Sequence, residues 1–302
     1  MKRAIKNMFT IFKQAYKEWL SKDPFRESAS IAYYSIFSLP GLLVVIVTLA
    51  GYFFGEEAVN NNIAKQITGT FGTDTAEQIQ AMIAKASTTK NSMLATLLGI
   101  VTIITGAIGV FVQFQKSLNM IWEVKPDTTK SGVWAYVKVR LFSFGLIVAV
   151  AFILIASLVI STILSAVGDW LSGHFHDSFV VFLHIVNFVL SLSILAFLFA
   201  LMFKFFPDAK IKWRDVWVGS LVTAFLFDIA KFGLGLYFGK ANPGTGYGAA
   251  ASIVLILLWV SYSSMIVFYG AEFTRAYTNM YSGSVRPSEI AHIDTSHKQD
   301  TK

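Results

Sequence analysis

Six long apolar runs alternate with polar segments along the chain. At 1.5 Å of rise per residue, about 20 apolar residues in a helix cross about 30 Å of hydrocarbon, and every run reaches that length. Pro40 is expected to kink the first run. We therefore predict an all-α polytopic membrane protein with six transmembrane helices, at residues 31–54, 93–114, 141–167, 179–206, 216–238 and 250–273.

The polar segments carry helical patterns of their own. In residues 1–30, apolar side chains recur at steps of three and four, mostly opposite lysines and an arginine, which predicts a basic amphipathic helix on the membrane surface. In residues 55–92, a capping-box pattern from Thr75 to Gln78 stands between two stretches of helical apolar spacing and predicts an outer helical hairpin. Whether this hairpin is a lid, a lipid-facing pair, a docking surface or plain structural packing is left open. Residues 274–302 are predicted to form a polar tail.

Lysine and arginine are distributed unevenly between the segments that join the predicted spans. Four segments carry 20 of them and the other three carry 4. Because positive residues concentrate on the cytoplasmic side, both termini are predicted to be cytoplasmic. The charge-rich segments are 1–30, 115–140, 204–215 and 274–302. We expect them to meet anionic membrane lipid and not nucleic acid, because no single basic face is built.

Composition narrows the class further. Hydrophobic residues make up 55% of the chain and charged residues 14%, against about 25% in ordinary soluble proteins, which excludes a disordered chain and a typical soluble enzyme. Cysteine is absent, so disulfides and thiolate metal sites are excluded. We find no hydrolase, zinc-protease or nucleotide-binding motif, and expect no catalytic residue, no metal and no cofactor. Two loops with weak resemblance to functional motifs, 174–177 (His-Phe-His-Asp) and 242–248 (Asn-Pro-Gly-Thr-Gly-Tyr-Gly), are interpreted as a polar loop and a tight turn.

Polar residues inside the apolar runs are the candidate functional residues. Asp228 and Lys231 lie three residues apart in the fifth predicted span, where they can pair, and a charge at the bilayer centre costs about 2.5–3.5 kcal/mol. Two interpretations stay open, a structural ion pair and a polar lining for transport. His184 and Asn187 form a weaker polar stripe in the fourth span, and Glu272 is expected to pair with its neighbour Arg275.

Three segments together resemble one family. They are Asp23-Pro24 with S-A-S-I-A-Y-Y-S-I-F-S-L-P at 28–40, K-S-L-N-M-I-W-E-V-K-P at 116–126, and short motifs from V-W-V-G-S at 216–220 to Y-G-A-E-F at 269–273. Over residues 20–280 the chain resembles the YihY/virulence factor BrkB family of bacterial inner-membrane proteins. The matching positions are Tyr33, Tyr34, Pro40, Asn119, Trp122, Pro126, Asp228, Lys231, Tyr247, Gly248, Gly270 and Glu272. The chain departs from the family pattern at Gly41, where many relatives have proline, and at Asp228, where many have glutamate.

The resemblance implies six spans with cytoplasmic ends in the bacterial inner membrane, in agreement with the charge distribution. Family members are linked to envelope functions, so we expect a transporter or flippase-like exporter of a lipidic or amphipathic envelope substrate. Substrate would move near Asp228, Lys231 and the first and sixth spans. The alternative is a non-transporting membrane scaffold for envelope assembly. An older family label, ribonuclease, lacks support because the sequence shows no metal-binding or acid/base cluster. An oligomer is compatible with the sequence.

Overall fold

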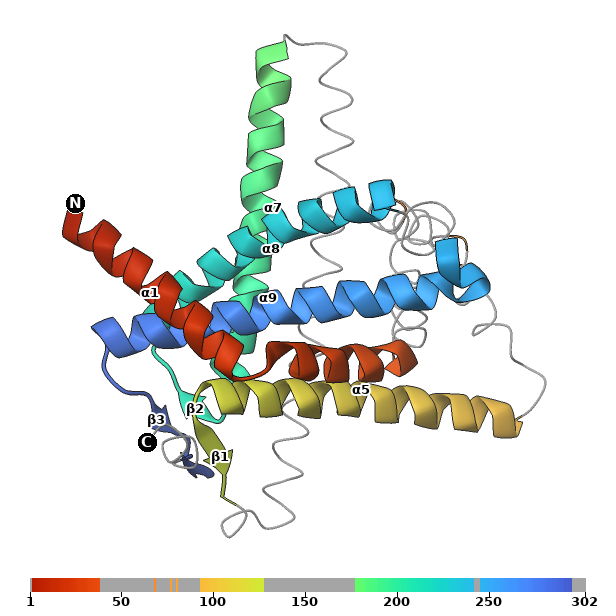
Figure 1. Ribbon diagram of the computed structural model, residues 1–302, viewed down its shortest axis with the longest axis horizontal. Coiled ribbons are helices and arrows are strands. Elements are labelled where there is room, and N and C mark those ends of the chain that lie inside the picture. The colour runs from red at the N-terminus through yellow and green to blue at the C-terminus, as the bar shows by residue number, and fades with distance from the viewer. Residues whose placement is uncertain are drawn as a thin grey trace. The chain divides into compact units, whose positions relative to one another are not determined.

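The computed structural model describes residues 2–38, 93–127, 177–241 and 245–294, with the isolated positions 68, 77 and 80. These residues are mainly helical (Figure 1). The helices are α1 (Lys2–Ser21), a helix over 24–38, α5 (Met93–Ile121), α7 (Asp177–Phe205), α8 (Trp213–Ala241), the short 3₁₀ helix η1 (Thr245–Ala250) and α9 (Ala251–Tyr281). The strands of the described residues are β1 (Val124–Pro126), β2 (Ala209–Lys210), β3 (Arg286–Pro287) and β4 (Ala291–Ile293).

Three of the described helices are long and apolar enough to cross a membrane. They cover Phe188–Phe205, Trp213–Phe238 and Ala251–Tyr281, and match the fourth, fifth and sixth predicted spans. The prediction of a helical membrane protein is therefore confirmed. The second predicted span falls in α5, and the first is described, as helix, only through residue 38. Because 39–54, 141–167 and nearly all of 55–92 lie outside the described residues, the count of six spans and the outer hairpin stay predictions.

The structure differs from the all-α prediction at the ends of the helices. α9 continues past the predicted end at 273 to Tyr281, and the chain then returns to form β3 and β4. β4 pairs antiparallel with β1, and β3 pairs antiparallel with β2. Polar segments that leave apolar helices still need partners for their backbone groups, and these short ladders supply them. Part of the predicted polar tail is thus ordered structure.

The N-terminal segment forms two helices, where the amphipathic pattern alone indicated one over 1–30. α1 ends at Ser21, and Asp23 takes a φ of 50°, a left-handed conformation that aspartate tolerates better than most residues. Pro24 follows at the first position of the next helix, where its missing N–H costs no hydrogen bond. The chain therefore turns sharply between the two helices.

α1 buries one side against α9, where Met8 and Phe12 of its apolar pattern are partly buried. Ile11 and Ala15 are fully buried against Phe273 and Ala276 of α9. The aromatic side chain of Phe9 is instead 71% exposed, as are about half of Tyr16 and Leu20, whose relative exposures are 55% and 50%. α1 is thus held by protein on one face and presents a second apolar face outward.

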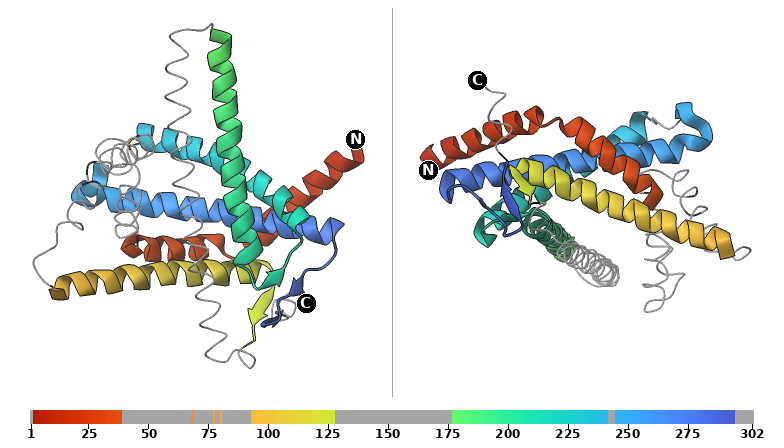
Figure 2. Two further views of the ribbon diagram at one scale, coloured as in Figure 1. Left: turned by 180° about the vertical axis from the view of Figure 1, so that it is seen from behind. Right: turned by 90° about the horizontal axis from the view of Figure 1, so that it is seen from below.

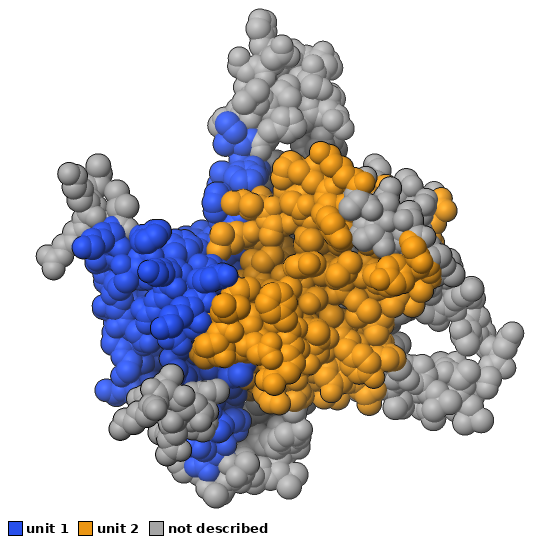
Figure 3. Space-filling model, viewed as in Figure 1, with its two compact units in different colours: residues 1–18, 118–225, 269–302 blue, residues 19–117, 226–268 orange. Residues whose placement is uncertain are grey.

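The chain divides into two compact units (Figure 3). Unit 1 comprises residues 1–18, 118–225 and 269–302, and unit 2 comprises residues 19–117 and 226–268. α9 contributes to both units and is one unbroken helix in each of the further views (Figure 2).

Within unit 1, α8 and α9 approach closely through two reciprocal glycine–threonine contacts. A Cβ placed on Gly270 would lie 2.0 Å from Thr223 Oγ1, and one placed on Gly219 would lie 1.8 Å from Thr274 Oγ1. Each threonine hydroxyl donates to the glycine carbonyl of its own helix at 2.7 Å. This small-residue contact is the kind by which membrane helices associate.

Within unit 2, glycines of α5 provide a similar contact with the helix over 24–38. A Cβ on Gly109 would lie 2.5 Å from the ring of Tyr34, and one on Gly106 would lie 3.1 Å from the backbone nitrogen of Ser38. These two glycines therefore let α5 approach the helix over 24–38 closely.

Candidate functional site

A buried carboxylate, Glu27, lies in unit 2 on the helix over 24–38. The residue is 7% exposed. Its Oε2 accepts hydrogen bonds from Gln113 Nε2 at 2.8 Å and from Ser117 Oγ at 2.7 Å, both on α5. Its Oε1 lies 3.5 Å from Nη2 of Arg26, whose own side chain is 69% exposed. The shorter contacts of this carboxylate are thus with neutral donors.

The same helix turn contacts α9. The hydroxyl oxygens of Ser28 and Ser261 lie 3.1 Å apart, and Trp19 Nε1 donates to the carbonyl of Met265 at 3.1 Å. Ser261 stands at the centre of the apolar run 250–273. The contacts therefore bring Glu27 next to the middle of an apolar stretch of α9, although its sequence position suggested the membrane surface.

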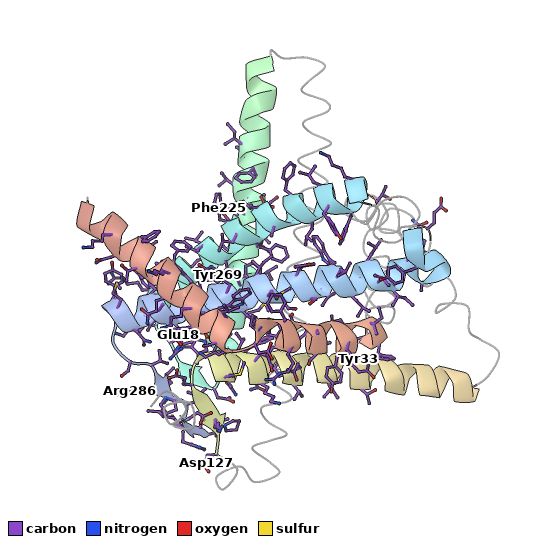
Figure 4. The ribbon with its side chains drawn as sticks, in the orientation of Figure 1. Glu18, Tyr33, Asp127, Phe225, Tyr269 and Arg286 are labelled. Carbon is purple, nitrogen blue, oxygen red and sulfur yellow. The ribbon has the colours of Figure 1, made fainter. Side chains whose placement is uncertain are left out.

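A second polar cluster lies in unit 1, where Arg275 of α9 faces three carboxylates. Its Nη1 lies 3.4 Å from Glu272 Oε2 and 3.9 Å from Glu18 Oε2, and its Nη2 donates to Glu123 Oε1. Glu272 is 1% exposed and the Arg275 side chain 13%. Glu18, labelled in Figure 4, comes from the end of α1. This cluster ties α1, α9 and the end of α5 together.

The segment that follows α5 adds a third polar contact in unit 1. Asn119 is buried; its Nδ2 donates to Asp208 Oδ2, and its Oδ1 accepts from the Asp208 backbone N–H, both at 2.7 Å. Glu123 lies in the turn after α5 with a φ of 53°, a strained conformation for glutamate, and its carbonyl accepts from the Asp294 N–H at 2.8 Å. The ion pair with Arg275 and this backbone bond hold the strained turn.

The structure places the two charged candidates of the fifth span on α8 without joining them. Asp228 is half-buried and Lys231 is exposed, and within the described residues no ion pair links them. The expected pairing is therefore not present in this structure, and a transport role for either residue remains a prediction.

For the other candidate residues of the apolar spans, the structure describes fewer side-chain contacts. His184 and Asn187 lie on α7, and their side chains fall outside the described part of the chain. Glu272 and Arg275 do pair, as given above. Among the described residues no group of three or more His, Asp or Glu side chains could hold a metal ion.

The family-motif positions fall into different environments. Tyr33 is 59% exposed, whereas Tyr34 covers Gly109. Trp122 is 4% exposed and thus buried in protein. Pro126 is the last residue of β1, and Gly270 makes the contact with Thr223 described above. Tyr247 is exposed and Gly248 lies in η1. Pro40 lies outside the described residues.

Sequence reasoning missed Glu27, although a signal was present. The buried positions of the helix over 24–38 recur at steps of three and four and include Ile31, Ser35 and Ser38. Extending this stripe backwards from the apolar run reaches position 27, which identifies the glutamate as inward-facing. Glu123 and Asp208 were also missed; their partners come from distant segments, which no local pattern indicates.

Comparison with known proteins gives consistent matches along the chain. The family model described as Virulence factor BrkB matches residues 15–291. A UPF0761 membrane protein of Saccharophagus degradans is 24% identical over 270 residues, covering 87% of this chain but only 58% of that protein. UPF0761 membrane proteins of Pseudoalteromonas atlantica and Alteromonas mediterranea are 27% and 26% identical, and the alignments cover 85% and 87% of their lengths. No solved structure matches the chain.

Proposed function

This chain belongs to the virulence factor BrkB family of membrane proteins, and from that premise we propose that it transports a lipidic or amphipathic envelope substrate across the bacterial inner membrane. The family resemblance read from the sequence is thereby confirmed, and the transport activity is our proposal. We place both termini in the cytoplasm because of the charge distribution. The proposal assigns the chain no catalytic residue and no cofactor, and its expected partners are membrane lipids.

The observation that carries this proposal is the buried carboxylate of Glu27. Its residue is 7% exposed, and it lies between the helix over 24–38 and α5, close to the middle of an apolar stretch of α9. Ionisable side chains at such positions are expensive, and they usually mark substrate or ion pathways.

Unit 2 also contains the other charged residues of the proposed pathway. Asp228 and Lys231 belong to it, together with the helix over 24–38, most of α5 and the apolar half of α9. A half-buried carboxylate on an apolar helix can meet a polar headgroup while the hydrocarbon part of the substrate stays in lipid. We therefore propose that unit 2 carries the substrate pathway.

Transport of labelled phospholipids in proteoliposomes tests the proposal. Wild-type protein is expected to move label between leaflets faster than empty vesicles. Glu27→Leu and Asp228→Ala are expected to fall to the empty-vesicle rate, because each removes a polar group from the pathway. Glu289→Gln is the matched control; its carboxylate is 90% exposed and should not affect the rate. If wild-type and empty vesicles move label equally fast, the transport proposal is wrong.

The scaffold alternative is favoured by one observation, the outward apolar face of α1. Phe9, Tyr16 and Leu20 are exposed on it, beside lysines. If this face docks a partner, the triple serine variant of these residues should fail to restore envelope integrity in a deletion strain, whereas Glu27→Leu should restore it. The transport proposal predicts that Glu27→Leu fails. Dye entry through the envelope measures both variants in one experiment.

A further inference from the structure

We infer that Glu27 binds and releases a proton, and that this proton couples substrate movement to a proton gradient across the membrane. The coupling part rests on the proposed transport function. The proton-binding part rests on the hydrogen bonds around the carboxylate alone and is testable without any transport measurement.

The hydrogen bonds around Glu27 satisfy both its charged and its neutral form. Ser117 Oγ lies 2.7 Å from Glu27 Oε2 and 3.0 Å from the carbonyl oxygen of Gln113. When the carboxylate is ionised, the serine hydroxyl donates to it. When a proton from the aqueous phase binds Oε2, the acid donates to Ser117 Oγ, and the serine hydrogen turns to the Gln113 carbonyl. Neither form leaves the serine hydroxyl without a partner, so the exchange avoids the cost of a buried unsatisfied group.

Neutral groups supply the shorter hydrogen bonds to Glu27. On its own helix, Arg26 touches Oε1 at 3.5 Å from an exposed position. α5 faces it with the neutral side chains of Gln113 and Ser117, and the single charged residue of α5, Lys116, is exposed. α9 carries no charged residue from Ala251 to Ala271, and its Tyr262 is exposed.

This arrangement contrasts with that of Glu272 in unit 1, the other buried glutamate among the described residues. Glu272 lies 3.4 Å from Arg275, whose side chain is 13% exposed. A buried arginine stabilises the ionised carboxylate directly, since the attraction is weakly screened. Glu272 thus has a buried cation as its partner, whereas the shorter contacts of Glu27 are with the neutral donors of Gln113 and Ser117.

Infrared difference spectroscopy of the purified full-length protein tests proton binding directly. Wild-type protein taken between neutral and acidic pH is expected to show a protonated-carboxyl band from a buried group. Glu27→Gln, which keeps the side-chain volume, should lose this band, and Glu27→Asp should keep one at a changed frequency. Glu272→Gln is the matched buried control and should retain the wild-type band. A band that persists in Glu27→Gln, or that is absent from wild type, overturns the inference.

A gradient experiment in proteoliposomes tests the coupling. Labelled phospholipid is first distributed equally between the leaflets, and a difference of one pH unit is then imposed. One proton moved per substrate supports an asymmetry of up to about tenfold in wild-type vesicles. Glu27→Gln vesicles should keep the equal distribution. An asymmetry that is the same in both proteins overturns the coupling.

The two experiments separate the failure of this inference from the failure of the proposed function. Wild-type vesicles that move no label, together with a carboxyl band that depends on Glu27, reject transport and retain the proton site. Label movement with no such band rejects the proton site and retains transport.

Discussion

Replacing Arg275 with methionine is expected to lower the free energy of unfolding by about 3–5 kcal/mol. The substitution leaves the carboxylates of Glu272, Glu123 and Glu18 facing a neutral side chain. The main cost comes from Glu272, which is 1% exposed, and less comes from Glu18, which is 40% exposed and screened by water. Thermal unfolding of the protein in detergent micelles measures the loss.

The control for Arg275 is an exposed ion pair of the same unit. Lys210 and Glu289 are 59% and 90% exposed, so Lys210→Met should cost less than about 1 kcal/mol. Adding Glu272→Gln to Arg275→Met should recover part of the lost free energy of unfolding, because it removes the most deeply buried negative charge of the three carboxylates around Arg275. Equal unfolding temperatures for Arg275→Met and Lys210→Met would contradict the interpretation of this cluster.

Replacing Gly270 with alanine is expected to cost about 3 kcal/mol or more, a large effect for one added methyl group. The new Cβ would lie 2.0 Å from Thr223 Oγ1 and 2.6 Å from its Cγ2, so α8 and α9 must move apart within unit 1. That movement also disturbs the reciprocal contact of Gly219 with Thr274. Thermal unfolding in micelles again provides the measurement.

Two further variants show whether the contact or the loss of glycine is responsible. Gly233→Ala on α8 adds the same methyl group with nothing within 4 Å, and should be neutral or slightly stabilising. Thr223→Gly combined with Gly270→Ala moves the small residue to the opposite helix and should restore part of the stability. A Gly270→Ala protein as stable as Gly233→Ala would show that the helices are not in close contact.

The three spans found in the described residues were predictable from the sequence because they depend on length and apolar content. A run such as 250–273 has to be a helix if it crosses hydrocarbon, since only internal hydrogen bonds satisfy its backbone there. The end of α9 was not predictable in the same way. Residues 274–281 are polar enough to resemble a tail, and they stay helical because Ala276 packs on α1 and Thr278 bonds to the Thr274 carbonyl.

The face of α1 shows a similar limit. Its amphipathic pattern correctly indicated a helix, but the apolar residues cover more than one side of it. Contacts with Phe273 chose Ile11 and Ala15 as the buried pair and left Phe9 outside. The sequence pattern does not show which apolar residues of α1 are buried, because their burial depends on the shape of a surface more than two hundred residues away in the chain.

By itself, the sequence determined the membrane class, the family and the positions of three described helices, because apolar length and family motifs are local properties. Only the tertiary structure decided which charged residues are buried together. Asp228 and Lys231 are not joined in the structure, whereas Glu27 and Arg275 have partners that come from other segments. The physical reason is that burial and hydrogen bonding of a charge depend on neighbours in space, whereas helix formation in an apolar run depends mainly on neighbours in the chain.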